Sequence, residues 1–223
     1  MIFSKDHNFL LLKNGKVGGT ALEFSLSPVL PKNAIVTPAT GNSPEWKIIN
    51  EELPLDYNPR NYENFFNHIS YSEIERKIDL KDVKSYIFVR NPYEIVLSHF
   101  FHRLYFLNKN LIWNKLDKKE QEQLLDKYFN NELQTKWHTS TKYLYLSKNN
   151  EIQITEFLFY EKNINFEINK ILKKHNIPLI ETNIKSKNFK PKEITYKDVF
   201  SDNHLEIIYD NWEWEFKYFN YEK

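Results

Sequence analysis

The residues best suited to chemistry lie in a short glycine-rich stretch near the start of the chain. Three of the four glycines, Gly15, Gly18 and Gly19, lie close together, and Lys16 and Thr20 lie among and beside them. Glycine lets a backbone turn sharply or approach a ligand closely. Backbone N–H groups at such a turn, with a helix beginning beside them, form a site for a phosphate or another anion. A lysine ammonium and a threonine hydroxyl would complete this anion site.

An ordinary strand-to-helix turn is the alternative explanation for the same glycines. The stretch is not a Walker A loop, because that motif places its lysine after the last glycine and directly before Ser or Thr. Here Lys16 comes before the glycine pair. The order of the residues therefore counts against the common nucleoside-triphosphate site.

A second group with the same chemistry follows the apolar run at residues 85–89. Arg90 comes directly after this run, then Asn91 and Pro92, with Ser98 further along. A guanidinium at the end of a strand can bind a phosphate through two parallel hydrogen bonds. Arg90 and Ser98 could converge only if the arginine reaches back along the following helix. An arginine paired with a carboxylate, and a serine that faces solvent, are the alternative.

Hydrophobic patterning predicts the elements that must position these residues. Strands separated by helices indicate right-handed crossovers and a parallel sheet. We therefore expect a single α/β domain over residues 1–223, with a central parallel sheet flanked by helices. Residues 38–60 are expected to form a long surface segment. The predicted strands are 7–13, 33–37, 85–89 and 153–160, and the predicted helices are 20–26, 72–78 (capped by Ser72 with Glu75), 93–107, 115–129, 165–175 and 203–219.

Composition narrows the function classes. The 223 residues carry a net charge of +1 and no cysteine. The even charge balance argues against nucleic acid or a membrane surface as a partner, so any anion site must be local. The lack of cysteine excludes disulfides and thiolate metal sites. We find no apolar run near the ~20 residues that span a bilayer and no signal peptide, so we expect a cytoplasmic protein.

Taken together, the two groups resemble the signatures of the PAPS-dependent sulfotransferases, particularly the carbohydrate and heparan-type enzymes. The K-x-G-G-T-x-L-E signature is matched by residues 16–23, and V-R-N-P-Y…S by residues 89–93 with Ser98. Residues 68–74 and 159–163 resemble further family segments more loosely. The likeness is strong to about Arg103 and loose beyond it. Residues 139–141 read Thr-Ser-Thr where the family often has Pro-Gln.

This resemblance implies a P-loop-like three-layer fold and the donor 3′-phosphoadenosine-5′-phosphosulfate (PAPS), with no metal required. It implies that the glycine-rich stretch holds the 5′-phosphosulfate and that the second group holds the 3′-phosphate. The implied donor-binding residues are Lys16, Gly18, Gly19 and Thr20 for the first and Arg90 and Ser98 for the second.

Sulfuryl transfer needs a cation beside the leaving oxygen and a base for the acceptor hydroxyl. Lys16 is the predicted catalytic cation. His68 is the predicted base, with Glu23 and Glu45 as alternatives. The expected acceptor is a hydroxyl of a saccharide or small metabolite. A nucleotide kinase, a non-catalytic nucleotide-binding protein and a structural protein are the competing hypotheses.

Overall fold

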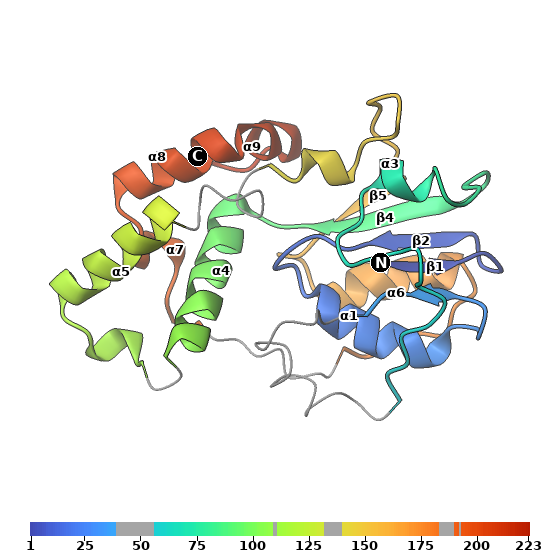
Figure 1. The fold of residues 1–223 in the computed structure, drawn as a ribbon, viewed down its shortest axis with the longest axis horizontal. Helices are drawn as coiled ribbons and strands as arrows, with labels where there is room; N and C mark the ends of the chain where they lie inside the picture. Colours follow the sequence, from blue (N-terminus) through green and yellow to red (C-terminus); the bar gives the residue numbers. More distant parts are fainter. Residues whose placement is uncertain (39–55, 109–110, 132–139, 183–189, 192) are drawn as a thin grey trace. The chain divides into compact units, whose positions relative to one another are not determined.

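The computed structural model describes residues 1–38, 56–108, 111–131, 140–182, 190–191 and 193–223 (Figure 1). The chain divides into two compact units. Unit 1 comprises Met1–Arg90 and Lys142–Ser186, and unit 2 comprises Asn91–Thr141 and Lys187–Lys223. The expectation of one domain over the whole chain stays a prediction.

Unit 1 is built on a sheet that has five strands in the described residues, in the order β3-β1-β2-β4-β5. Strands β2, β4 and β5 are parallel neighbours. Strand β1 is antiparallel to both β2 and β3, so within the described sheet it alone runs against the others. The prediction of a parallel sheet was therefore wrong at β1. The strands are β1 (Ile2–Ser4), β2 (Phe9–Leu12), β3 (Ile35–Val36), β4 (Lys84–Val89) and β5 (Glu156–Phe159).

The reversal arises at the turn between β1 and β2. Residues 5–8 alone join the two strands, and the N–H of Asn8 donates to the carbonyl of Lys5 over 3.0 Å. A parallel pair needs a connection of a dozen or more residues. A link this short can give only a hairpin, and the three-residue β1 that it adds was missed by the sequence prediction.

Helices cover both faces of this sheet. In unit 1, α1 (Gly19–Leu26) and α6 (Ile164–Lys174) lie on one side and α3 (Tyr71–Ile74) on the other (Figure 1). The first two helices bury apolar residues against the strands, which stabilises the layer by about 25 cal/mol per Å² of apolar surface removed from water. This architecture confirms the predicted α/β class, with a mixed sheet flanked by helices. The hydrophobic core between these helices and the strands includes Leu22, Leu26, Ile168, Ile171 and Leu172 from the helices and Phe9, Leu11, Tyr86, Phe88 and Leu158 from the strands.

The direction of the strands brings chemically useful residues to one edge of the sheet. Strands β2, β3, β4 and β5 run the same way, so their carboxyl ends meet at this edge. Lys13, Thr37, Arg90 and Tyr160 each follow one of these strand ends directly. Ligands of α/β sheets bind outside the carboxyl ends of the strands. This edge is therefore where a site is expected.

The N-cap of helix α3 lies two residues before the predicted one, and the helix ends at Ile74 rather than at Ile78. Its N-cap is Ser70, whose side chain accepts from the N–H of Glu73, while the Glu73 carboxylate accepts from the N–H of Ser70. The spacing of the capping box occurs twice here, and the prediction chose Ser72 with Glu75. The earlier register buries Tyr71 and Ile74, which decides between the two.

Unit 2 consists of helices around an aromatic core. The predicted helices 93–107 and 115–129 are confirmed by α4 (Pro92–Leu107) and α5 (Lys118–Asn131). The predicted helix 203–219 is confirmed except at Trp212, where the chain leaves helical geometry with φ −122 and ψ 23, so two helices form instead of one. The break separates α8 (Asp202–Asn211) from α9 (Glu213–Phe219), after a short α7 (Tyr196–Val199). Core residues include Tyr93, Phe100, Trp113, Tyr128, Phe129, Phe200, Trp212 and Phe216.

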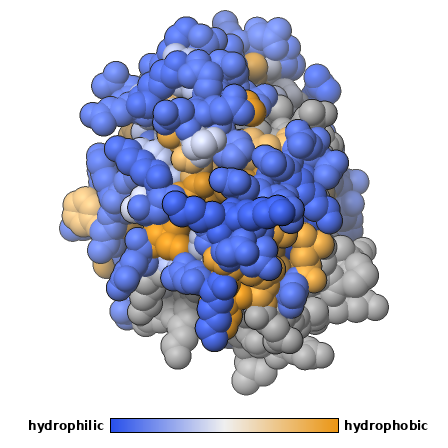
Figure 2. Space-filling model, turned by 90° about the vertical axis from the view of Figure 1, so that its left-hand side faces the viewer, coloured by the Kyte–Doolittle hydropathy of each residue, from blue (hydrophilic) through white to orange (hydrophobic). Residues whose placement is uncertain are grey.

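The surface is mainly hydrophilic on the face drawn in Figure 2, with apolar side chains showing between the polar ones. Single exposed apolar residues are normal on protein surfaces. Within the residues that the structure describes, no helix combines the length and the apolar character needed to cross a membrane.

Candidate anion-binding site

The glycine loop between β2 and α1 has left-handed backbone at two positions. Gly18, the N-cap of α1, has φ 75, and Lys16 has φ 57. Left-handed backbone is unusual for a lysine, and such strain gathers at ligand sites. Helix α1 has no side-chain cap and no acidic residue in its first turn. Its first N–H groups, which have no partner within a helix, therefore keep the positive end of the helix dipole.

Gly18 lies against the end of β5 and the start of α6. A Cβ atom at this position would lie 3.0 Å from Cδ1 of Ile164 and 3.2 Å from Cε2 of Tyr160. Both distances are too short for ordinary packing. Both the backbone angle and the neighbours therefore favour glycine at residue 18.

Arg90 links the glycine loop to the ends of the two neighbouring parallel strands. Its Nη1 donates to the backbone oxygen of Lys16 over 3.0 Å. Its guanidinium carbon lies 4.6 Å from the centre of the Tyr160 ring, a cation–π distance. Residues from the ends of β2, β4 and β5 are therefore in contact. Lys16 and Arg90, the two cations singled out in the sequence, are therefore in contact at one edge of the sheet.

The Lys16 ammonium lies in a positive environment. Burial is the larger cause and the charge of Arg90 the smaller; together they lower the pKa of Lys16 from 10.5 to about 8. Both effects disfavour the charged form of Lys16, for which the described residues supply no negative partner. A bound anionic ligand would relieve this cost, because its negative charge would lie near both cations.

Asn14 ties the start of the loop to β4 and to a segment far along the chain. Its Oδ1 accepts from the N–H of Gly15 over 2.7 Å. Its Nδ2 faces the carbonyl of Phe88 at 3.5 Å and the hydroxyl of buried Tyr145 at 3.4 Å. These contacts hold the start of the loop at Asn14, whereas Arg90 holds it at Lys16. The loop therefore has a defined shape without a ligand.

His68, the predicted base, lies beside the end of β2. Its Nδ1 is 3.0 Å from the backbone oxygen of Lys13, and since a carbonyl only accepts, Nδ1 carries the proton. Nε2 is then the unprotonated nitrogen of the neutral ring. Burial, followed by the charge of Lys13, lowers the pKa of His68 from 6.5 to about 4. The imidazole is therefore neutral at pH 7 and can accept a proton.

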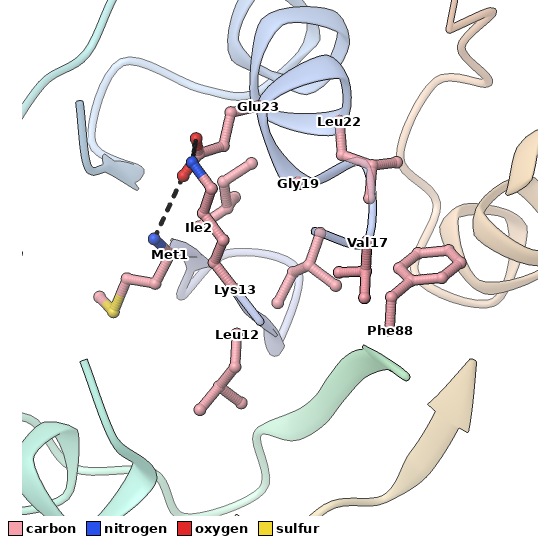
Figure 3. A pocket seen from close by; sticks show the side chains of 10 residues that line it. Met1, Ile2, Leu12, Lys13, Val17, Gly19, Leu22, Glu23 and Phe88 are labelled. Carbon is pink, nitrogen blue, oxygen red and sulfur yellow. Dashed lines mark hydrogen bonds and ion pairs between the residues drawn. The ribbon is translucent and has the colours of Figure 1, made fainter. Parts of the chain in front are cut away.

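Glu23, the first alternative base, is buried and fully engaged (Figure 3). One carboxylate oxygen accepts from Lys13 Nζ at 2.5 Å. The other accepts from the Met1 amino group and from Thr37 Oγ1, each at 3.3 Å. A carboxylate held this way, with an exposed fraction of 2%, is poorly placed to accept a proton from a substrate. Glu45, the second alternative, lies outside the described residues, as do residues 39–55 of the predicted surface segment.

Ser98 belongs to α4 in unit 2, whereas Arg90 is the last residue of the first part of unit 1. Their convergence on one phosphate stays a prediction. Gly18, Gly19 and Thr20 follow one another at the start of α1, next to Lys16, as the sequence predicted.

Two residues of this site were missed by sequence reasoning. Lys13 is the first residue after β2, and Tyr160 the first after β5. Their position at strand ends was a signal that could have singled them out. The pairing of Lys13 with Glu23 and of Tyr160 with Arg90 could be found only in the structure.

In the described ranges, no group of three or more His, Asp or Glu side chains could hold a metal ion. The metal independence implied by the sequence stays a prediction. Comparison with protein-family models and with curated proteins found no match to this chain. The argument for function therefore rests on the geometry at the sheet edge.

Proposed function

We propose that the chain is a PAPS-dependent sulfotransferase with a P-loop-like fold, which transfers a sulfuryl group to an acceptor hydroxyl. One observation carries the proposal. Lys16 in a left-handed glycine loop and Arg90 at the next parallel strand end are in contact, through the 3.0 Å hydrogen bond from Nη1 to the Lys16 carbonyl. A donor with a phosphosulfate and a separate 3′-phosphate has anionic groups for both cations.

The residues suit both anionic groups of such a donor. The N–H groups at the start of α1 and the Lys16 ammonium would bind the phosphosulfate. Arg90, with Ser98 of unit 2, would bind the 3′-phosphate. The low pKa of Lys16, about 8, supports this assignment, because it reports a cation that gains from an anionic partner.

In the proposed reaction the acceptor oxygen attacks sulfur, and the bond from sulfur to the bridging oxygen breaks. The leaving group is adenosine 3′,5′-bisphosphate, and its bridging oxygen gains negative charge. Lys16 stabilises that charge, and removing one such donor typically lowers the rate about 10²–10³-fold. The acceptor proton passes to Nε2 of His68. The low pKa of the ring makes it a weak base. An anion bound near it would raise this pKa and so make His68 a stronger base.

A hydroxyl of a saccharide or small metabolite is the proposed acceptor. A cytoplasmic location is proposed with it, on the absence of cysteine. Lys16 precedes the glycine pair, and this order favours a sulfotransferase over a nucleotide kinase.

Calorimetry with adenosine 3′,5′-bisphosphate tests the proposal. We expect binding to the wild-type chain without Mg²⁺, and much weaker binding to Lys16→Ala and Arg90→Ala. Arg90→Lys is the matched control for charge, because lysine keeps the cation but loses the planar fork. It should bind more weakly than wild type and more tightly than Arg90→Ala.

Other results would count against the proposal. Preference for ATP with Mg²⁺ would indicate a kinase. Bisphosphate binding without any PAPS turnover over a broad panel of hydroxyl acceptors would indicate a non-catalytic binding protein. If neither nucleotide binds, the proposed function is wrong.

A further inference from the structure

A buried ion pair lies directly under the glycine loop. Lys13 Nζ is 2.5 Å from Glu23 Oε2, and the exposed fractions of the two side chains are 7% and 3%. Lys13 follows β2, and Glu23 lies in the second turn of α1, so the pair links the two elements that flank the loop. Figure 3 shows both side chains pointing toward one another beside Gly19.

The stem of Lys13 fills the space beside Gly19. A Cβ atom on this glycine would lie 2.8 Å from Cγ of Lys13 and 3.0 Å from its Cε. Because residue 19 has no side chain, the stem of Lys13 can occupy this space. Contact along the whole stem fixes where the first turn of α1 lies relative to β2.

The same lysine also reaches the predicted base. Its backbone oxygen accepts from Nδ1 of His68 over 3.0 Å. Glu23, at the other end of the pair, is further held by Thr37 at the end of β3. The pair is thus in contact with the loop, with His68 and with a third strand end.

A buried pair of this kind adds little net stability, because the cost of removing two charges from water offsets their attraction. What it does supply is a fixed geometry. The space around the pair agrees with this role, since the cavity beside it measures only about 10 Å³ and is lined mainly by apolar residues. No ligand larger than one water molecule fits there.

We propose that Lys13 and Glu23 are positioning residues, which hold the glycine loop in the shape that binds an anion. Lys13 itself does not bind the ligand. This inference rests on the proposed function, because the anion is the nucleotide donor or its bisphosphate product.

Glu23→Gln separates positioning from simple electrostatics. The substitution removes a negative charge close to an anion site, which by charge alone would strengthen anion binding. If the pair positions the loop, binding weakens instead, by at least about tenfold, because small displacements of binding groups are costly. Adenosine 3′,5′-bisphosphate is the probe, and calorimetry gives its Kd.

Lys13→Met/Glu23→Gln guards against a variant that does not fold. It removes both charges of the pair, keeps most of the stem over Gly19 and does not change the net charge. The buried Met1 amino group loses its carboxylate partner, but burial already lowers its pKa to about 6 and the loss of Glu23 lowers it further, so this group is neutral at pH 7. We again expect bisphosphate binding at least about tenfold weaker than wild type. Lys170→Met/Glu156→Gln is the matched control, because it removes an exposed pair of the same type, at 2.6 Å, from unit 1. Its bisphosphate affinity should equal that of wild type.

Glycine-selective ¹⁵N labelling adds a readout that a loss of stability alone would not change. The chain has four glycines, so its spectrum is simple. In wild type the bisphosphate should shift the amide signals of Gly18 and Gly19. In the double variant these signals should already be displaced without ligand, and respond less to it.

Bisphosphate affinity at or above the wild-type value in Glu23→Gln and in the double variant would overturn this inference alone. Equal weakening in the surface control would overturn it as well. A wild-type chain that does not bind the bisphosphate would overturn the proposed function and, with it, this inference.

Discussion

Arg90 donates from Nη1 to the backbone oxygen of Lys16 over 3.0 Å. One arginine therefore fixes the peptide of the glycine loop and also raises the positive potential that the Lys16 ammonium experiences. Because both effects come from one side chain, the two predicted phosphate-binding groups are not independent. A ligand that binds one of them should change the other.

The pKa of Lys16 predicts a pH dependence of ligand binding. This pKa is lowered to about 8, so the ammonium loses its proton as the pH rises through that value. Bisphosphate affinity should therefore fall above about pH 8, by up to about tenfold per pH unit. Lys16→Arg should bind with an affinity that changes little over the same range, because arginine stays charged. Calorimetry between pH 7 and pH 10 measures both slopes, and equal slopes would contradict the assignment.

Tyr160 should matter for binding through its ring. The ring lies 4.6 Å from the Arg90 guanidinium carbon and packs against Gly18. Tyr160→Leu removes a cation–π contact of about 0.5–2 kcal/mol, so bisphosphate affinity should fall about 2- to 30-fold. Tyr160→Phe keeps the ring and is the control, with affinity close to wild type. A loss of the same size in both variants would assign the effect to the hydroxyl instead.

Gly15 and Gly18 of the loop should differ in their tolerance of alanine. Gly18→Ala forces φ 75 on a residue with a side chain and creates contacts at 3.0 and 3.2 Å. It should lower the free energy of unfolding by roughly 1–3 kcal/mol. At Gly15 a Cβ atom meets nothing within 4 Å. Gly15→Ala should therefore be neutral or slightly stabilising. Urea unfolding of both variants tests the difference, and equal destabilisation would contradict it.

His68 should make the fold sensitive to acid. Its pKa is about 4 in the folded chain and 6.5 in the reference state. The unfolded chain therefore takes up the proton first, so stability is complete above about pH 6.5 and is lost as the pH falls toward 4. The loss reaches at most about 3 kcal/mol.

His68→Asn removes this titration. Asparagine tolerates the left-handed backbone at residue 68, which has φ 59, and its amide can donate to the Lys13 carbonyl. The free energy of unfolding of this variant should depend less on pH between 6.5 and 4 than that of wild type. Urea titrations at a series of pH values give the comparison, and identical curves would show that His68 is not buried as a neutral ring.

The parts of the fold that the sequence predicted are those where short-range signals agree. The strand before the glycine loop and the strand before Arg90 are apolar runs, each followed by residues that do not continue the run. Strand β1 was missed, because three residues carry no readable period. The break at Trp212 was missed as well, since the aromatic residues on either side suit a helix and only packing divides it.

The site divides in the same way. Lys16 and Arg90 could be placed at one sheet edge from the chain order alone, because parallel strands share a carboxyl edge. The Lys13–Glu23 pair and the contact of Tyr160 with Arg90 depend on side chains distant in sequence. Charge and spacing do not encode such contacts, so they could not be predicted.

The left-handed backbone of Lys16 has a consequence for how this chain can change. A residue with a Cβ atom held at such an angle costs about 1–2 kcal/mol, and glycine at residue 16 would avoid that cost. Under the proposed function, selection for a more stable fold and selection for an anion-binding ammonium therefore favour different residues at this one position. Lys16→Gly would give a more stable fold that has lost the proposed anion-binding ammonium.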